Sequence, residues 1–138
     1  MPALSLEKIT VFIADDHAVL REGLKLLLES NEKIKVIGDA DNGRDTVKQI
    51  KILKPDVVIM DIAMPELDGI EATRQIIEQL PSTSVIILSM HSSPEYVHRS
   101  IDAGAKGYIL KESAGNEIIN AVLSCAAGKR YLSKKKSE

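Results

Sequence analysis

Five polar residues stand directly after short hydrophobic segments of the chain. Asp15 and Asp16 follow the first such segment, Asp61 the third, Ser89 the fourth and Lys111 the fifth. If the segments are parallel strands, their carboxyl ends meet at one edge of a sheet, where open α/β sheets bind ligands. Three carboxylates, a hydroxyl and an amine would then surround a single pocket.

This set of side chains predicts phosphoryl chemistry assisted by a metal. Clustered carboxylates repel one another and favour a bound cation, and an all-oxygen ligand set suits Mg²⁺. A carboxylate can also act as a nucleophile and form an aspartyl phosphate. Phosphoryl transfer depends on positioning and on neutralising charge, which the Lys111 ammonium and the Ser89 hydroxyl could provide. We therefore predict a Mg²⁺-dependent phosphoacceptor site.

Each of these residues also has an ordinary structural interpretation when it is taken alone. An aspartate after a strand is often a helix cap or a turn residue, and Asp16 could simply cap the following helix. The functional hypothesis depends on the complete set, in this order, on a repeating strand–helix pattern.

The segments that would position these residues alternate between two kinds. Continuous hydrophobicity rich in β-branched residues is typical of buried parallel strands. It predicts strands at 9–14, 34–37, 57–60, 85–88 and 107–110. Segments of helical periodicity lie between them, and the last carries Ile118, Val122 and Ala126 on one predicted hydrophobic face.

Turn and cap residues agree with this pattern. Asp68-Gly69-Ile70-Glu71 resembles a capping box, and Lys54-Pro55 ends a helix before a strand. Five strand–helix units predict an α/β fold: a doubly wound, five-stranded parallel sheet of flavodoxin-like order 2-1-3-4-5, with helices on both faces. This domain covers 8–128, and 129–138 has the character of a linker or C-terminal tail.

Bulk composition narrows the function classes. The 138 residues fit one domain, and a net charge of -2 argues against the broad basic surface of a nucleic-acid binder. Cys125 is the only cysteine, which excludes an internal disulfide; we expect it to pack in the last helix. The sequence has no signal-peptide pattern and no segment suited to span a bilayer, so we expect a cytoplasmic protein without membrane association.

The motifs resemble the receiver domains of bacterial two-component response regulators over about residues 8 to 128. The matching segments are 13–17, 60–69, Ser89 and Lys111. The segments 89–91, 103–111 and 127–133 resemble the NarL/FixJ (LuxR-type) branch of that family. The resemblance implies that Asp61 accepts a phosphoryl group from the phosphohistidine of a sensor histidine kinase.

The resemblance implies further roles around Asp61. Asp16, Asp61 and the backbone carbonyl of Ala63 would bind Mg²⁺, and Asp15 would act through metal-bound water. Lys111 occupies the position of the family's lysine at the phosphorylation site. The chain would be a phosphoacceptor that assists its own phosphorylation and dephosphorylation, rather than an enzyme acting on another molecule.

The resemblance also implies a conformational switch. Ser89 stands at the family's Thr/Ser switch position and Tyr108 at its switch aromatic position. Phosphorylation would draw Ser89 toward the phosphoryl oxygens and turn Tyr108 inward, which would change the face formed by the fourth helix, fifth strand and fifth helix. Glu112 stands where many receivers have a cis-proline, which leaves the local loop geometry open. We expect His91 to overlook the pocket and influence hydrolysis, and His17 and His98 to be solvated.

The implied function is control of transcription through a DNA-binding helix-turn-helix domain absent from this chain. The alternative is a stand-alone receiver that signals through protein partners. A homodimer is also implied, either through the first and last helices or through the face formed by the fourth helix, fifth strand and fifth helix.

Two other function classes agree less well with the residues. A phosphatase of the haloacid-dehalogenase type would have a second aspartate where Ala63 stands. A flavodoxin would need a loop of hydroxyls and glycine at 15–17, where this chain has two aspartates and a histidine.

Overall fold

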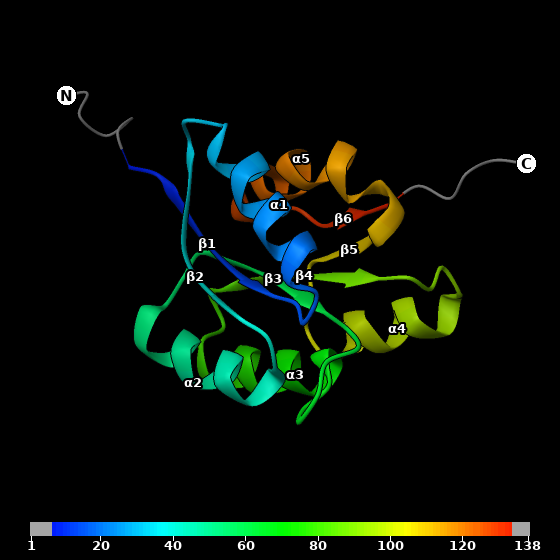
Figure 1. The fold of residues 1–138 in the computed structure, drawn as a ribbon. Coiled ribbons are helices and arrows are strands. Elements are labelled where there is room, and N and C mark those ends of the chain that lie inside the picture. Colours follow the sequence, from blue (N-terminus) through cyan, green and yellow to red (C-terminus); the bar gives the residue numbers. More distant parts are fainter. Residues whose placement is uncertain (1–6, 134–138) are drawn as a thin grey trace, which may run out of the picture.

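The computed structural model describes residues 7–133 as one parallel sheet between two layers of helices (Figure 1). The strand order is β2-β1-β3-β4-β5-β6, and all pairings are parallel. The strands are β1 (Ile9–Ala14), β2 (Ile34–Ala40), β3 (Val57–Asp61), β4 (Ser84–Ser89), β5 (Gly107–Leu110) and β6 (Tyr131–Leu132). The helices are α1 (Ala18–Glu29), α2 (Gly43–Leu53), α3 (Gly69–Gln79), α4 (Pro94–Asp102), the short 3-10 helix η2 (Lys111–Ser113) and α5 (Ala114–Ala126).

The doubly wound α/β fold and the order of the first five strands are confirmed, but the predicted number of strands is wrong. The described sheet has six strands, because β6 pairs with β5 in the segment expected to be linker or tail. The Tyr131 N–H donates to the Lys106 carbonyl (2.9 Å), and the Ser133 N–H donates to the Tyr108 carbonyl (2.8 Å). A strand of two residues has no periodicity of its own, and long-range pairing with β5 is what makes it a strand.

Successive residues of the strands alternate between two hydrophobic layers. Val11 and Ile13 pack in the layer that contains α1 and α5, whereas Phe12 and Ala14 pack in the layer that contains α2 and α3. Figure 1 shows α1 and α5 on one side of the sheet and α2, α3 and α4 on the other. Because both faces are covered, the central strands are hydrophobic at nearly every position, and each large aliphatic side chain contributes roughly 1.5–3 kcal/mol on burial.

The start of α3 and the end of α2 lie where the sequence predicted them. The Asp68 carboxylate caps α3 by accepting a hydrogen bond from the Glu71 N–H at 2.9 Å. Lys54 closes α2 in the left-handed conformation, with φ of 49°, and Pro55 follows it. The cap fixes the start of α3, and α3 follows the strand that carries Asp61.

The buried face of α5 differs in part from the predicted face. Ile118 and Val122 are buried as expected, but Ala126 is exposed and Cys125 completes the face instead. Cys125 is buried in the hydrophobic layer of α1 and α5, so it is a packing residue as predicted, and this burial raises the pKa of its thiol to about 11.

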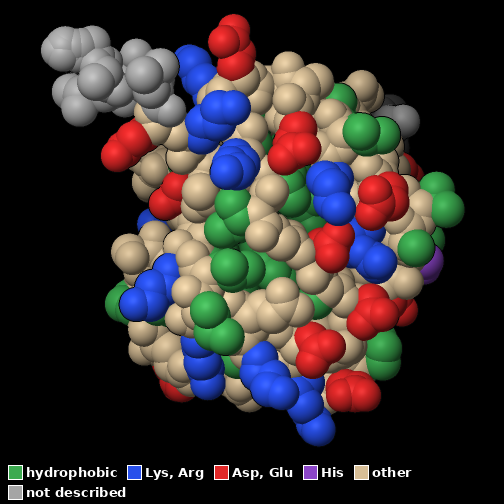
Figure 2. All heavy atoms as spheres, turned by 60° about the vertical axis from the view of Figure 1, so that its left-hand side comes forward, with side chains coloured by type: hydrophobic (Ala, Val, Ile, Leu, Met, Phe, Trp, Pro, Cys, Tyr) green, Lys and Arg blue, Asp and Glu red, His purple; other side chains and the backbone are tan. Residues whose placement is uncertain are grey.

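The surface seen from the β2 side carries both signs of charge. Figure 2 shows acidic and basic side chains interspersed on this face, with hydrophobic side chains near its centre. The described residues therefore present no continuous basic surface on this side, in agreement with the net charge of -2. None of the helices within 7–133 is long and apolar enough to cross a membrane.

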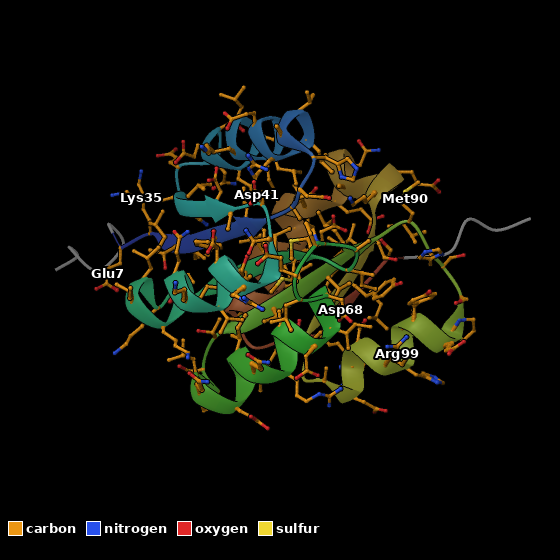
Figure 3. The ribbon with its side chains drawn as sticks, turned by 60° about the horizontal axis from the view of Figure 1, so that its bottom comes forward. Glu7, Lys35, Asp41, Asp68, Met90 and Arg99 are labelled. Atoms are coloured by element: carbon orange, nitrogen blue, oxygen red, sulfur yellow. The ribbon has the colours of Figure 1, made fainter. Side chains whose placement is uncertain are left out.

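The topology separates two loops at the carboxyl end of the sheet. The chain moves from β1 to β2 on one side and returns to β3 on the other side, so the loops after β1 and β3 diverge. In Figure 3, Glu7 and Lys35 lie at the amino end of the strands, whereas Asp68 and Met90 lie at the opposite end. Side chains that follow β1 and β3 are therefore brought to the same end of the sheet.

Candidate functional site

The structure brings the three predicted carboxylates together. One ligand atom from each of Asp15, Asp16, His17 and Asp61 lies within 4.8 Å of the others. The parallel pairing of Ala14 with Met60 places the ends of β1 and β3 side by side. Asp15 and Asp61 are buried and Asp16 is exposed at the rim. We refer to these four residues as the acidic cluster.

Lys111 directly follows β5, and its side chain extends to the carboxylates of the acidic cluster. Its ammonium lies 3.1 Å from Asp61 Oδ2 and 3.3 Å from Asp15 Oδ2. These are ion-pair distances, and within 7–133 neither buried oxygen receives a hydrogen bond from any other group. One ammonium thus faces two buried carboxylates, so the cluster retains acceptor capacity for a further cation or hydrogen-bond donor.

The environment of Asp61 makes its carboxyl group unusual. Burial, reinforced by the negative charge of Asp15, raises the pKa of Asp61 to about 6, against the opposing effects of Lys111 and of the Ala63 N–H. The Ala63 N–H donates to Asp61 Oδ1 at 3.2 Å. A carboxyl group whose pKa is displaced by burial and by a like charge is typical of functional sites.

The donor set of the acidic cluster suits a hard divalent cation. Three carboxylates supply oxygen ligands, and two of their buried oxygens lack hydrogen-bond partners in the described part of the chain. Mg²⁺ prefers oxygen ligands and retains several waters, which the exposed rim at Asp16 allows. The residues present are therefore compatible with the predicted Mg²⁺.

His17 lies closer to the carboxylates than a solvated helix-start residue needs to. It is the N-cap residue of α1, and its side chain is 63% exposed, as expected for a solvated helix start. Its ring Nδ1 nevertheless lies 3.0 Å from Asp15 Oδ1 and 3.2 Å from the Lys111 ammonium. The sequence signal was its position next to the two aspartates.

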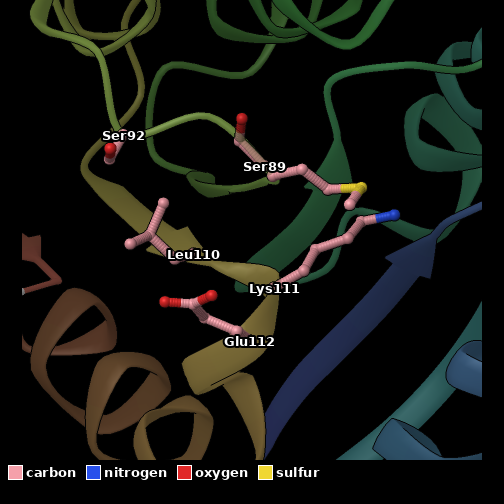
Figure 4. A pocket seen from close by; sticks show the side chains of 6 residues that line it. Ser89, Ser92, Leu110, Lys111 and Glu112 are labelled. Atoms are coloured by element: carbon pink, nitrogen blue, oxygen red, sulfur yellow. The ribbon is translucent and has the colours of Figure 1, made fainter.

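The predicted switch residues form a second group beside the acidic cluster. The Ser89 hydroxyl accepts a hydrogen bond from the His91 N–H at 2.9 Å, and the Tyr108 hydroxyl donates to the His91 carbonyl at 2.6 Å. The Tyr108 ring is buried. Figure 4 shows the Ser89 hydroxyl and the Lys111 ammonium pointing in different directions. Ser89 and Tyr108 are thus linked through the backbone N–H and carbonyl of His91, in the loop after β4.

The expected position of the His91 side chain is wrong. Its ring stacks on Tyr96 of α4, with centroids 4.5 Å apart and an interplanar angle of 13°. His91 takes part in the site through its backbone, which bonds Ser89 and Tyr108. Aromatic stacking fixes the ring against α4, while His98 is exposed as predicted.

Gly69 contributes to the site in a way that the sequence signalled only through the capping motif. A Cβ atom at this position would overlap the backbone carbonyl oxygen of Asp61. The Gly69 N–H also donates to the Ile62 carbonyl at 2.8 Å. Helix α3 therefore begins directly against the backbone of Asp61, and only glycine permits this approach.

A small cavity lies between Ser89 and Lys111. It has a volume of about 160 Å³. Figure 4 shows it, with the lining residues Ser89, Met90, Ser92, Leu110, Lys111 and Glu112. Met90 is 80% exposed.

The fold and the site together define a class of protein. A doubly wound parallel sheet carries two aspartates after β1, one at the end of β3, a hydroxyl at the end of β4 and a lysine after β5. The family described as response regulator receiver domain matches residues 11–123, and the chain belongs to this family.

Individual relatives place the chain in the NarL/FixJ branch. The transcriptional regulatory protein DegU of Brevibacillus brevis is 39% identical over 125 residues, which cover 91% of this chain and 53% of DegU. The signal receiver domain of the response regulator NarL from Mycobacterium tuberculosis is 38% identical, with a TM-score of 0.85 over 89% of this chain and 99% of that domain. A LuxR-family response regulator from Aurantimonas is 31% identical, with a TM-score of 0.88, and 92% of this chain and 91% of that chain are covered. The chain spans about half the length of the curated relative DegU.

Proposed function

We propose that Asp61 accepts a phosphoryl group from a sensor histidine kinase in a Mg²⁺-dependent reaction, and that the resulting conformational change controls transcription. The observation that carries this proposal is the buried Asp61 carboxylate, which is held 3.1 Å from the Lys111 ammonium inside the acidic cluster. Membership of the receiver family supports the kinase as phosphodonor. In this proposal the chain is a phosphoacceptor that assists its own reactions, and it acts in the cytoplasm, as response regulators typically do.

The chemistry assigned to Asp61 is nucleophilic substitution at phosphorus. A carboxylate oxygen of Asp61 forms a bond to phosphorus, and the bond from phosphorus to the donor nitrogen or oxygen breaks, with its electron pair leaving on the donor. Mg²⁺ held by Asp16, Asp61 and the Ala63 carbonyl, with Asp15 acting through water, would neutralise charge between the carboxylate and the phosphoryl group. Lys111 is placed to pair with a phosphoryl oxygen and stabilise the product.

The switch is proposed to start at Ser89. When its hydroxyl turns to the phosphoryl oxygens, the His91 N–H loses the acceptor that it has at 2.9 Å. The loop after β4 must then rearrange, and the Tyr108 hydroxyl, bonded to the same residue, changes with it. A local charge on Asp61 would thus bias a two-state element on the side of α4 and β5.

The output is proposed to be a DNA-binding domain that is absent from this chain. DegU is a transcriptional regulatory protein, and the chain covers about half of it, which favours this output over a stand-alone receiver. The gene sequence that follows the codon for Glu138 discriminates between the two. A helix-turn-helix pattern there supports the proposal, and a stop codon favours the stand-alone alternative.

A homodimer through α1 is the partner arrangement that the surface favours. Val19 and Leu26 on α1 are 88% and 74% exposed, and a Cβ at Gly23 between them would meet nothing within 4 Å. The alternative face is partly covered, because β6 of the same chain lies on β5. Leu26→Glu should lower the mass measured by light scattering, whereas Ile52→Glu, on an isoleucine that is 79% exposed on α2, should not.

The phosphoacceptor proposal is tested by incubating the protein with acetyl phosphate, with and without Mg²⁺, and measuring the intact mass. A phosphoryl adduct should form only with Mg²⁺, and the Asp61→Asn variant should not form it. Absence of the adduct in a wild-type protein that binds Mg²⁺ would contradict self-catalysed phosphorylation from a small donor. Absence of both would contradict the metal site as well.

A further inference from the structure

Arg21 on α1 makes a contact that none of the roles above uses. Its Nη1 donates to the backbone carbonyl of Asp15 at 2.6 Å, in a partly buried position. Its Nε lies 3.7 Å from Asp39 Oδ2, and this buried Nε has no hydrogen-bond partner in the described chain. The guanidinium is therefore held most closely by Asp15, with Asp39 as a second, looser ion-pair partner.

The carbonyl that Arg21 holds belongs to the peptide that joins Asp15 to Asp16. A peptide group is planar, so fixing its oxygen also fixes the direction in which the chain enters Asp16. The neighbouring groups of Asp15 are also held, because its N–H donates to the Ala40 carbonyl at 3.1 Å and its Oδ1 accepts from the His17 N–H at 2.8 Å. Oδ2 is the polar atom of Asp15 that is left to face Lys111.

We propose that Arg21 is a positioning residue that orients the Asp15–Asp16 peptide, and through it both carboxylates, for divalent cation binding. This inference rests on the proposed Mg²⁺ site. Among the interactions of Arg21 within 7–133, no hydrogen bond or ion pair joins it to a carboxylate oxygen of Asp15, Asp16 or Asp61, so it acts through the backbone. Groups that orient metal ligands in this indirect way commonly affect metal affinity by about 10–100-fold.

The sign of the effect separates positioning from simple electrostatics. Arg21 carries a positive charge near the cluster, and removing a positive charge strengthens the binding of a cation if nothing else changes. Loss of positioning weakens the binding instead. Lys25 provides a matched control, because its ammonium pairs with the same Asp39 at 3.2 Å from the same helix, but it makes no contact with Asp15 within 7–133.

The test compares the wild type with Arg21→Ala, Arg21→Lys and Lys25→Ala. Mg²⁺ affinity is measured by calorimetry, and the rate of phosphorylation by acetyl phosphate is measured as a function of Mg²⁺ concentration. Thermal unfolding in EDTA checks that each variant is folded, and Arg21→Lys carries the comparison if Arg21→Ala does not fold.

The proposal predicts that Arg21→Ala raises the Mg²⁺ dissociation constant by about 10-fold or more. The phosphorylation rate at saturating Mg²⁺ should stay close to the wild-type rate, and Lys25→Ala should bind Mg²⁺ like the wild type. Arg21→Lys should fall between, since lysine can donate to the Asp15 carbonyl but lacks the planar fork that also faces Asp39.

Two results would overturn the proposal. Equal or tighter Mg²⁺ binding by Arg21→Ala would leave only a structural or electrostatic role for this side chain. If the wild type itself bound no Mg²⁺, the proposed function would fail together with this inference. A wild type that binds Mg²⁺ and is phosphorylated, with an unchanged Arg21→Ala, would contradict the inference alone.

Discussion

The acidic cluster and the β6 edge, by which we mean residues 131–133 on the outer side of β5, satisfy their polar groups in opposite ways. In the acidic cluster, Asp15 Oδ2 and Asp61 Oδ2 are buried and share one ammonium, and no other group within 7–133 donates a hydrogen bond to them. At the β6 edge, the backbone N–H groups of Tyr131 and Ser133 donate to β5 and to the residue before it, and both side-chain hydroxyls donate to Glu117.

This contrast shows where the fold loses stability and where it gains stability. Buried carboxylate oxygens without hydrogen bonds cost free energy in the metal-free protein, and under the proposed function that cost is recovered when a cation or a phosphoryl group binds. Within 7–133, β6 has no buried side-chain nitrogen or oxygen without a hydrogen-bond partner, so its hydrogen bonds contribute to the folded state directly. Four substitutions, from the largest expected effect to the smallest, sharpen this contrast.

Removing Lys111 should have the largest effect. Lys111→Ala takes away the ammonium placed at Asp61, so we expect the rate of phosphorylation by acetyl phosphate to fall by about 10²–10³-fold. Lys106→Ala, which removes a lysine just before β5 outside the cluster, should keep the wild-type rate. Similar rates for both variants would show that Lys111 has no part in the chemistry.

Adding one methyl group at Gly69 should strain the backbone of Asp61. Gly69→Ala places a Cβ against the Asp61 carbonyl, and we expect a loss of roughly 2–4 kcal/mol in the free energy of unfolding. At Gly115 of α5 a Cβ meets nothing within 4 Å, and alanine should stabilise the helix by about 0.5–1 kcal/mol. Chemical denaturation of both variants measures the contrast, and equal stabilities would refute the close approach.

Neutralising Asp61 should stabilise the metal-free protein. Its pKa is raised from 3.8 to about 6, so between these values the native state binds more protons than the unfolded state, and stability falls as pH rises. An asparagine side chain does not titrate, so Asp61→Asn should gain roughly 1–3 kcal/mol at neutral pH, and the gain should vanish below the lower value.

Denaturation in EDTA at several pH values measures this gain. Glu78→Gln, on an exposed carboxylate of α3, should show no comparable change and serves as the control. A destabilised Asp61→Asn at neutral pH would mean that the ion pair with Lys111 outweighs the burial of the carboxylate.

Weakening the β6 edge should have the smallest effect on global stability. Tyr131→Phe removes the hydrogen bond of 2.8 Å from the Tyr131 hydroxyl to Glu117; loss of hydration and this carboxylate together raise the pKa of Tyr131 to about 12. We expect a global loss of about 1 kcal/mol or less, but faster hydrogen exchange at the amides of Tyr131 and Ser133. Tyr96→Phe should leave these amides unchanged. Unchanged exchange in Tyr131→Phe would mean that the backbone pairing alone holds β6.

The acidic cluster could be predicted from the sequence because its residues follow strands that are themselves easy to detect. Continuous hydrophobic segments indicate buried parallel strands, and the topology then fixes where Asp15, Asp61 and Lys111 meet. The capping motif at Asp68 was equally local and was confirmed. Both predictions needed only short-range pattern and the rule that parallel strands end together.

The remaining features depend on long-range contacts that leave no local pattern. Strand β6 exists through hydrogen bonds to β5 across the whole of α5. The ring of His91 is set by stacking on Tyr96, and Arg21 is set by a carbonyl six residues earlier and by Asp39 on a neighbouring strand. Which side chain meets which partner in these cases is decided by packing, which the spacing of residues does not encode.

If the acidic cluster presents Asp61 as the phosphoacceptor, locating the modified residue tests that role most directly. The protein would be treated with acetyl phosphate and Mg²⁺, the acyl phosphate reduced with borohydride, and the digested peptides sequenced by mass spectrometry. We predict that the reduced residue is Asp61, and that the peptide containing Asp15 and Asp16 is unmodified. Modification at any other residue, or at none in a protein that binds Mg²⁺, would contradict this assignment.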